Sequence, residues 1–199
     1  MYLTIGSVSI QKHWVAIILA MLIIELILVI RKKKVESDIF SSAIIMFILI
    51  WKLSILVFQF PFIIKNPLSI VYFDGGIKGY YLAIAIVLIY TWFKVQKQAI
   101  IKINSAIFLA LLMFNFYEII IHILLDGLFW VKAITLFVNL SFLLLLFMFG
   151  RKEVWNTQLA ILFPIIQILL YSIHDETITS ILTYSIIIFY LLIMKKRGN

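Results

Sequence analysis

The sequence predicts an all-α integral membrane protein, a bundle of about seven transmembrane helices with its N-terminus outside and its C-terminus in the cytoplasm. First, 65% of the 199 residues are apolar and only 13% are charged, too little charge to cover a water-soluble surface. Second, the apolar residues form long runs of spanning length. Third, the basic residues gather in alternate loops, as they do in multi-pass membrane proteins.

A helix rises about 1.5 Å per residue, so about 20 residues cross a hydrocarbon core of roughly 30 Å. The expected spans are His13 to Ile30, Ile39 to Val57, Ile77 to Val95, Ser105 to Leu125, Leu128 to Phe149, Trp155 to Ile173 and Ile178 to Met194. We expect residues 1–199 to form a single polytopic membrane domain. The first run is followed by four basic residues, which is the order of a retained span rather than of a cleaved signal peptide.

The loops carry the orientation signal. Twelve of the 17 basic residues fall on the side predicted to be cytoplasmic: Arg31, Lys32, Lys33, Lys34, Lys94, Lys97, Lys102, Arg151, Lys152, Lys195, Lys196 and Arg197. The other five, in outer loops or outer halves of spans, are Lys12, Lys52, Lys65, Lys78 and Lys132. The net charge of +8 therefore indicates the orientation of the chain, because the basic residues lie in short loops next to anionic lipid headgroups. We expect no nucleic-acid partner.

The longest outer connection runs over residues 58–76. It contains Pro61, Pro67 and the pair Gly75 and Gly76, which favour irregular backbone. Most of its other residues are apolar. We therefore expect an outer interfacial loop that lies in the membrane surface rather than in water.

The predicted fourth span carries the clearest polar pattern. Asn115, Glu118, His122 and Asp126 are spaced three, four and four residues apart, which places them on one face of a helix. A carboxylate and an imidazole one turn apart could work as an acid–base pair. They could equally pair with lysines of other spans and contribute only to packing. Ionisable groups at this depth, roughly 5–10 Å from the outer end of the span, are functional candidates by default.

Three lysines join this outer polar layer. Lys52 and Lys132 lie inside spans near their outer ends, where each could bind a lipid headgroup or extend outward to water. Lys78 and Tyr80 begin the third span at the outer surface. Glu25 and Asn139 lie deeper and are expected to hydrogen-bond between helices.

The sequence predicts neither a metal site nor a cofactor. Cysteine is absent, and the three histidines are too scattered along the chain to suggest shared ligation. No glycine-rich phosphate loop, paired-histidine zinc spacing or GxSxG motif is present.

One segment resembles a known family. Its residues are Asn66-Pro67-Leu68-Ser69-Ile70, followed by Asp74-Gly75-Gly76-Ile77. Two further stretches agree, Ile5-Gly6-Ser7-Val8-Ser9-Ile10 before the first span and Trp51-Lys52-Leu53 in the second. Together they resemble the bacterial prolipoprotein diacylglyceryl transferases, over roughly Ile5 to Ala83. The resemblance implies a multi-pass protein of the bacterial cytoplasmic membrane that uses phosphatidylglycerol of the outer leaflet.

The chain departs from that family at the residues that carry its reaction. Tyr80 stands where the family has the histidine of its H-G-G motif. The family's arginine- and glycine-rich signature is reduced to Asn115-Phe116-Tyr117-Glu118. All three arginines fall on the predicted cytoplasmic side, so none offers a bidentate phosphate clamp at the outer surface.

Three functions follow as hypotheses. In the first, the chain is a diverged relative that binds an outer-leaflet phospholipid, or a lipoprotein or other membrane protein, without the transfer reaction. Its headgroup ligands would be Lys52, Lys78, Lys132, Gly75 and Gly76. In the second, an active acyl or glyceryl transferase uses a rebuilt site, with Glu118, His122 and Tyr80 as catalytic candidates together with Lys52. In the third, the chain is a membrane scaffold or a small transporter subunit.

Overall fold

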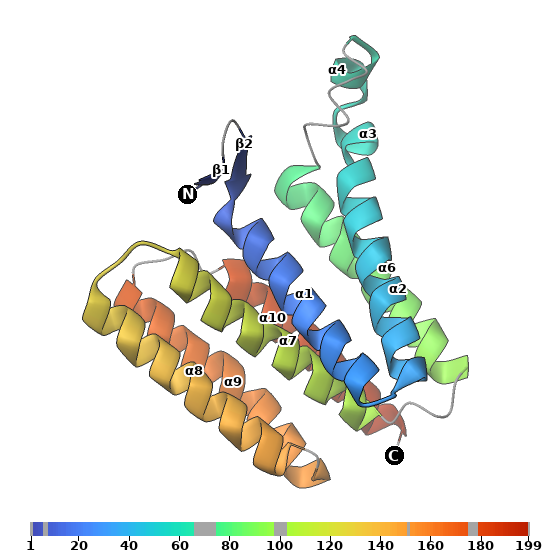
Figure 1. The fold of residues 1–199 in the computed structure, drawn as a ribbon. Helices are drawn as coiled ribbons and strands as arrows, with labels where there is room; N and C mark the ends of the chain where they lie inside the picture. Colours follow the sequence, from blue (N-terminus) through green and yellow to red (C-terminus); the bar gives the residue numbers. More distant parts are fainter. Residues whose placement is uncertain are drawn as a thin grey trace. The chain divides into compact units, whose positions relative to one another are not determined.

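The computed structural model describes residues 2–5, 8–65, 75–97, 103–150, 152–174 and 179–198 (Figure 1). The chain is helical, apart from a short N-terminal hairpin in the described part. Its elements are β1 (Tyr2–Ile5), β2 (Val8–Gln11), α1 (Lys12–Ile30), α2 (Lys34–Leu53), α3 (Ile55–Phe58), α4 (Phe60–Lys65), α6 (Gly76–Lys97), α7 (Ile103–Leu124), α8 (Phe129–Phe149), α9 (Glu153–His174) and α10 (Thr179–Gly198).

Six helices within the described ranges are long and apolar enough to cross a membrane, so the prediction of a helical multi-pass membrane protein is confirmed at that level. These stretches are Lys12–Ile30, Glu36–Phe58, Gly76–Lys94, Ile103–Leu124, Phe129–Phe149 and Glu153–Ser172. The seventh expected span coincides with α10, whose apolar stretch, Ile181–Lys195, is shorter. The total of seven crossings and the orientation of the termini stay predictions.

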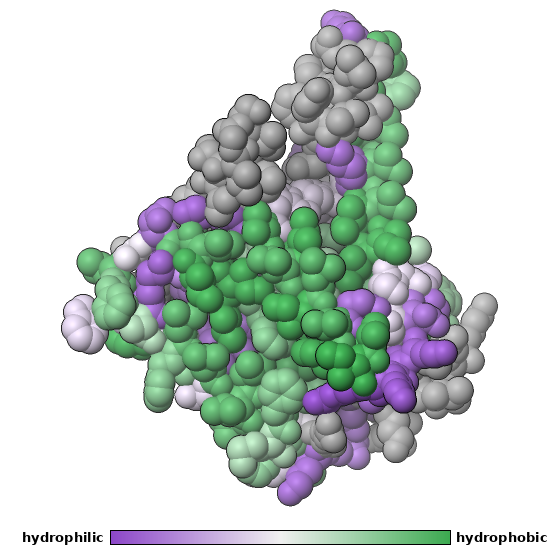
Figure 2. Space-filling view, in the orientation of Figure 1, coloured by the Kyte–Doolittle hydropathy of each residue, from purple (hydrophilic) through white to green (hydrophobic). Residues whose placement is uncertain are grey.

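The outward surfaces of these helices suit lipid. Large apolar side chains stay exposed along α8, including Phe137, Leu144 and Met148. Figure 2 shows the same property as hydrophobic colouring along the helices. Exposed apolar surface on this scale would be unfavourable in water, whereas hydrocarbon tails solvate it.

The chain forms two compact units. The first comprises Met1–Ile27 and Lys102–Asn199, and the second comprises Leu28–Ile101. The single polytopic domain expected over residues 1–199 stays a prediction.

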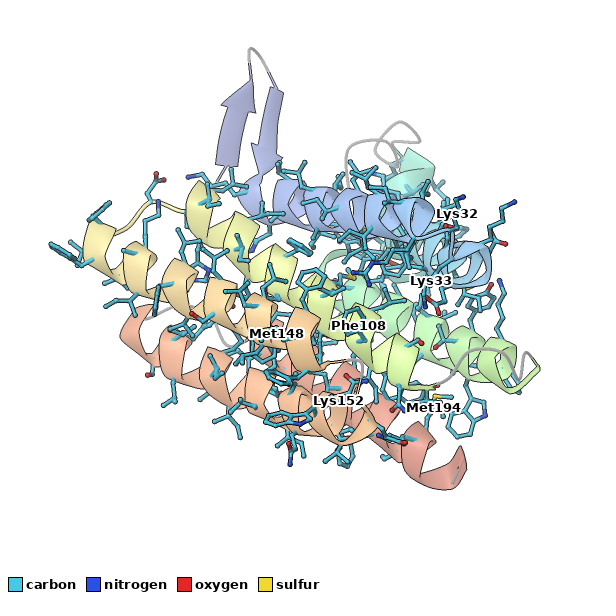
Figure 3. All side chains as sticks on the ribbon, turned by 60° about the horizontal axis from the view of Figure 1, so that its bottom comes forward. Lys32, Lys33, Phe108, Met148, Lys152 and Met194 are labelled. Atoms are coloured by element: carbon cyan, nitrogen blue, oxygen red, sulfur yellow. The ribbon has the colours of Figure 1, made fainter. Side chains whose placement is uncertain are left out.

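In the first unit, α7 packs against α8, α9 and α10. This central position buries apolar residues around α7, including Ile107, Leu111 and Ile121. Figure 3 shows Phe108, Met148, Lys152 and Met194 at one end of the unit, where α7 and α9 begin and where α8 and α10 end. Lys195 lies at the same end and bonds Thr157. Two of the basic residues predicted to be cytoplasmic, Lys152 and Lys195, therefore lie at this end.

The N-terminal hairpin pairs β1 with β2 in antiparallel register, with Leu3 opposite Ile10 and Thr4 opposite Ser9. The sequence alternates apolar and polar residues here, as strands do. The sequence analysis did not predict this hairpin, because it considered only the apolar runs long enough to span a membrane.

In the second unit, α2 and α6 pack together as antiparallel helices. The turn between α1 and α2 is closed by hydrogen bonds from the Lys33 amide to the Leu28 carbonyl and from the Lys32 amide to the Val29 carbonyl. Lys32 has a φ of 54° there, the left-handed conformation that ends many helices.

The expected outer loop begins with helix rather than irregular backbone. Its first residue, Phe58, ends α3, and α4 covers Phe60–Lys65. Phe60 and Ile64 are exposed, as expected of a segment in the membrane surface. Residues 66–74, with most of the family-like motif, lie outside the described residues.

Candidate functional site

The polar stripe of α7 turns inward. Asn115 and Glu118 are fully buried, and His122 is 1% exposed. They are buried because α7 is the helix that three others surround. Asp126 lies beyond the end of α7, and its side chain is 88% exposed. The stripe therefore contributes three residues to the interior of the first unit and one to its surface.

Glu118 is the centre of a buried carboxylate cluster, which we define as Glu118, His122, Tyr171 and Tyr184. The Tyr171 hydroxyl of α9 donates to the Glu118 carboxylate at 3.1 Å, and the Tyr184 hydroxyl of α10 donates to the same oxygen. The His122 ring nitrogen Nδ1 lies 2.8 Å from the Glu118 backbone oxygen and 3.4 Å from its Oε2. Because a carbonyl can only accept, Nδ1 carries a proton.

An amide cluster, which we define as Asn115, Asn139 and Gln167, lies one helical turn from the carboxylate cluster, toward the start of α7 and of α9. The Oδ1 of Asn139 accepts hydrogen bonds from Gln167 Nε2 at 2.8 Å and from Asn115 Nδ2 at 3.4 Å. Asn139 in turn donates to the Thr135 carbonyl of its own helix. The prediction that Asn139 hydrogen-bonds between helices is thus confirmed.

Two polar contacts join α1 to α7 and the turn after it, at the end of the first unit away from Lys152 and Lys195. Lys12 lies 2.6 Å from Asp126, and this hydrogen bond, followed by the attraction of the ammonium charge, lowers the pKa of the Asp126 carboxyl. His13 Nδ1 lies 2.8 Å from the Tyr117 hydroxyl. Lys132, in the first turn of α8, also lowers the pKa of Asp126 by its charge. These contacts tie the start of α1 to the end of α7.

The remaining headgroup candidates lie in the second unit, where α2 ends and α6 begins. The Gly75 amide donates to the Trp51 carbonyl at 3.3 Å, and Trp51 Nε1 donates to the Gly76 carbonyl at 3.1 Å. Lys52 follows Trp51 directly, and Lys78 stands in the first turn of α6. The antiparallel packing therefore brings both lysine-bearing helix ends together.

The two glycines of the family-like motif have local structural roles. Gly76 has a φ of 59°, which favours glycine over other residues. A Cβ on Gly75 would lie 1.7 Å from Ser54 Oγ, so the close approach of α2 to α6 requires a residue without a side chain. Asn66, Pro67 and Asp74 lie outside the described residues, so the rest of the motif has no structural account.

Tyr80, the third catalytic candidate, lies on α6 of the second unit. Its ring packs edge-on against Phe47 of α2 and Tyr81. Glu118 and His122 belong to the first unit, where they lie in contact with each other. The structure therefore brings two of the three candidates together within one unit.

Sequence reasoning missed Tyr171 and Tyr184. A signal was available for the first, since Gln167 and Tyr171 are four residues apart and share a face of α9. Tyr184 had no such signal, because the sequence does not state which face of α10 meets α7.

The carboxylate cluster can hold or exchange a proton, because it joins a carboxylate, an imidazole and two phenols. Among the residues that the structure describes, no group of three or more His, Cys, Asp or Glu side chains could hold a metal ion. No protein-family model, curated protein or solved structure matches the chain.

Proposed function

We propose that this multi-pass membrane protein binds an anionic phospholipid by its headgroup, where α2 ends and α6 begins, and lacks the transfer reaction of the family it resembles. Phosphatidylglycerol is the lipid that the resemblance suggests. The observation that carries the proposal is the Trp51–Gly75 contact, since it joins the helix ends that bear Lys52 and Lys78. Two ammonium groups at the same end of a helix pair favour the binding of a lipid phosphate there.

Helix polarity supports the same site. The first amides of α6 point out of its N-terminus, and a helix N-terminus favours negative charge. Lysine binds phosphate as a point charge, without the bidentate geometry of arginine. Headgroup binding needs no more than that, whereas positioning a phosphate for bond cleavage needs a defined orientation.

Exposed apolar residues supply the neighbouring lipid surface. Val57 and Phe58 end the α2–α3 segment, and Ile77 stands at the start of α6; all three are exposed. A lipid whose phosphate meets the lysines would lay its acyl chains along such side chains. Charge beside apolar surface is the arrangement that interfacial lipid binding uses.

The burial of the carboxylate cluster favours binding without transfer. Glu118 is fully buried and accepts hydrogen bonds from two tyrosines. A substrate would have to displace these bonds before Glu118 and His122 could act as an acid–base pair. The catalytic alternative stays a prediction, and a lipobox peptide supplied with phosphatidylglycerol tests it: we expect no glycerol phosphate release and no gain in peptide mass.

Lipid retention tests the binding proposal. The full chain is purified from membranes, and co-purified lipids are quantified by mass spectrometry. Lys52→Gln with Lys78→Gln removes two charges at the proposed site, and Lys32→Gln with Lys34→Gln removes two at the opposite end of α2. We expect anionic lipid to fall at least threefold in the first double variant alone. An equal loss in both, or none in either, would overturn the proposal.

A further inference from the structure

The proposed headgroup site lies below the outer end of the helix that carries Lys52. Trp51 contacts the start of α6, since its Nε1 donates to the Gly76 carbonyl at 3.1 Å. Phe47, one turn earlier on α2, packs against Tyr80, one turn later on α6, with ring centroids 5.6 Å apart. α6 therefore begins beside Trp51 and runs back along α2.

The other helix of this pair continues past that point. The Ser54 amide donates to the Ile50 carbonyl and the Phe58 amide donates to the Ser54 carbonyl, so helical bonding carries α2 into α3. Phe58 lies about 9 Å beyond Lys52 along this helix. Val57 and Phe58 are both exposed, and Figure 1 shows α3 beyond the start of α6. Apolar surface therefore extends past the level of the site.

The apolar length behind the two lysines is shorter than a bilayer core. On α6, Lys78 and Lys94 are separated by about 24 Å, and on α2, Asp38 and Lys52 are separated by about 21 Å. A typical hydrocarbon core is about 30 Å thick. The stretch Glu36–Phe58 is about 34 Å long and covers that thickness. Both lysines therefore start several Å below the level at which the neighbouring apolar surface ends.

A lipid phosphate and the lysines can meet at this depth in two ways. The lysine side chains can extend toward the surface, which covers part of the depth. The outer leaflet can also thin beside the shorter helix, at a cost that grows with each Å of mismatch. Lipids with shorter acyl chains lower that cost, because their headgroups lie closer to the centre of the bilayer.

From this register we propose that the site, which rests on the headgroup binding proposed above, takes its phospholipid from a locally thinned outer leaflet and selects short acyl chains over long ones. Lys52 and Lys78 hold the phosphate below the level of the surrounding headgroups. The apolar surface at Val57 and Phe58 stands beside it, in the leaflet of normal thickness. Two lipids with the same headgroup and different chain lengths therefore compete unequally for the site.

Competition between chain lengths tests this selection. The full chain is reconstituted in nanodiscs of dioleoyl phosphatidylcholine with equal traces of dimyristoleoyl and dierucoyl phosphatidylglycerol, and native mass spectrometry counts the lipids that stay bound. We expect the short-chain lipid to be retained at least about threefold over the long-chain lipid, since each Å of mismatch adds to the cost. Lys52→Gln with Lys78→Gln should abolish that ratio, and Lys32→Gln with Lys34→Gln should keep it.

The outcomes separate this inference from the proposed function. Equal retention of the two chain lengths, with phosphatidylglycerol still preferred over phosphatidylcholine, would overturn the chain-length selection and leave headgroup binding standing. Loss of the headgroup preference as well would overturn both. A ratio that survives Lys52→Gln with Lys78→Gln, or that is equal for the same two chain lengths of phosphatidylcholine, would also overturn the selection, because it would mean general lipid sorting around the helices.

A depth measurement tests the register while both lysines stay in place. The chain has no cysteine, so Val57→Cys and the reference Ile45→Cys, near the middle of α2, each take one polarity-sensitive fluorophore at an exposed position. We expect nitroxide-labelled acyl chains to quench both labels and aqueous iodide to quench neither. Quenching of the Val57→Cys label by iodide alone would place α3 in water above the headgroups and would overturn the proposal.

Discussion

The close packing of α2 on α6 gives a sharp test of the proposed binding region. A Cβ on Gly79 would lie 2.0 Å from Ser54 Oγ, 3.1 Å from Ser54 Cβ and 3.3 Å from Trp51 Cδ1. In Gly79→Ala the Ser54 hydroxyl must rotate away, which breaks its 2.6 Å hydrogen bond to the Trp51 carbonyl. Overpacking and the lost bond together should lower the free energy of unfolding by about 1.5–3 kcal/mol.

A second substitution isolates the cause. Ser54→Ala removes the clashing oxygen, so the double variant should cost at least about 1 kcal/mol less than the sum of the two single variants. Gly76 is the control: a Cβ there meets nothing within 4 Å, but its φ is 59°. Gly76→Ala should therefore cost about 1–2 kcal/mol of backbone strain, which Ser54→Ala does not relieve.

The assay is reversible unfolding in mixed micelles, followed by tryptophan fluorescence. Additive losses for Gly79→Ala and Ser54→Ala would refute the reasoning, since they would mean that the two residues do not meet. Rescue of Gly76→Ala by Ser54→Ala would refute it as well.

Three further outcomes are expected. Tyr184→Phe removes a hydroxyl that donates to the buried Glu118 carboxylate and should lower the free energy of unfolding by about 1.5–3 kcal/mol. Its control, Tyr81→Phe in the second unit, should change that free energy by less than about 0.5 kcal/mol. Equal losses for the two variants in thermal unfolding would contradict this expectation. The pKa of Asp126 is lowered by Lys12, so this pair stabilises the fold above the ordinary carboxyl pKa and ceases to do so as the pH falls through the lowered value. Asp126→Asn should flatten that part of a stability–pH curve, and an unchanged curve would exclude the contact. Lys32→Gly relieves a left-handed backbone and should raise the free energy of unfolding by about 0.5–1 kcal/mol; a loss would show that Lys32 does not hold φ at 54°.

The membrane helices were predictable because the bilayer imposes their length and their lack of charge. Six expected spans match candidate spans of the structure to within a few residues. α10 was expected on the same grounds, although its apolar stretch, Ile181–Lys195, is shorter than the other six. Composition and length therefore suffice for the elements, since lipid acts on each helix separately.

The candidate site was only half predictable. Helical spacing placed Asn115, Glu118 and His122 on one face, and all three are buried. It could not supply Tyr171 or Tyr184, because partners on other helices depend on how the helices rotate and pack. Asp126 shows a second limit, since the spacing rule holds only while the helix continues, and α7 ends at Leu124.

Gly75 and Gly76 show that one motif can have two explanations. The sequence predicted headgroup ligands, and the structure adds close packing against Ser54 and a left-handed backbone. Both explanations apply together if the glycines shape the end of α6 that a headgroup meets.

Lipid competition is the most direct test of the central claim. The purified chain is equilibrated with equal amounts of phosphatidylglycerol and phosphatidylcholine, and native mass spectrometry counts the lipids that stay bound. The account predicts that phosphatidylglycerol is retained in clear excess by the wild-type chain and loses that advantage in Lys52→Gln with Lys78→Gln. Equal retention of the two lipids by the wild-type chain, or an excess that survives the double substitution, would contradict it.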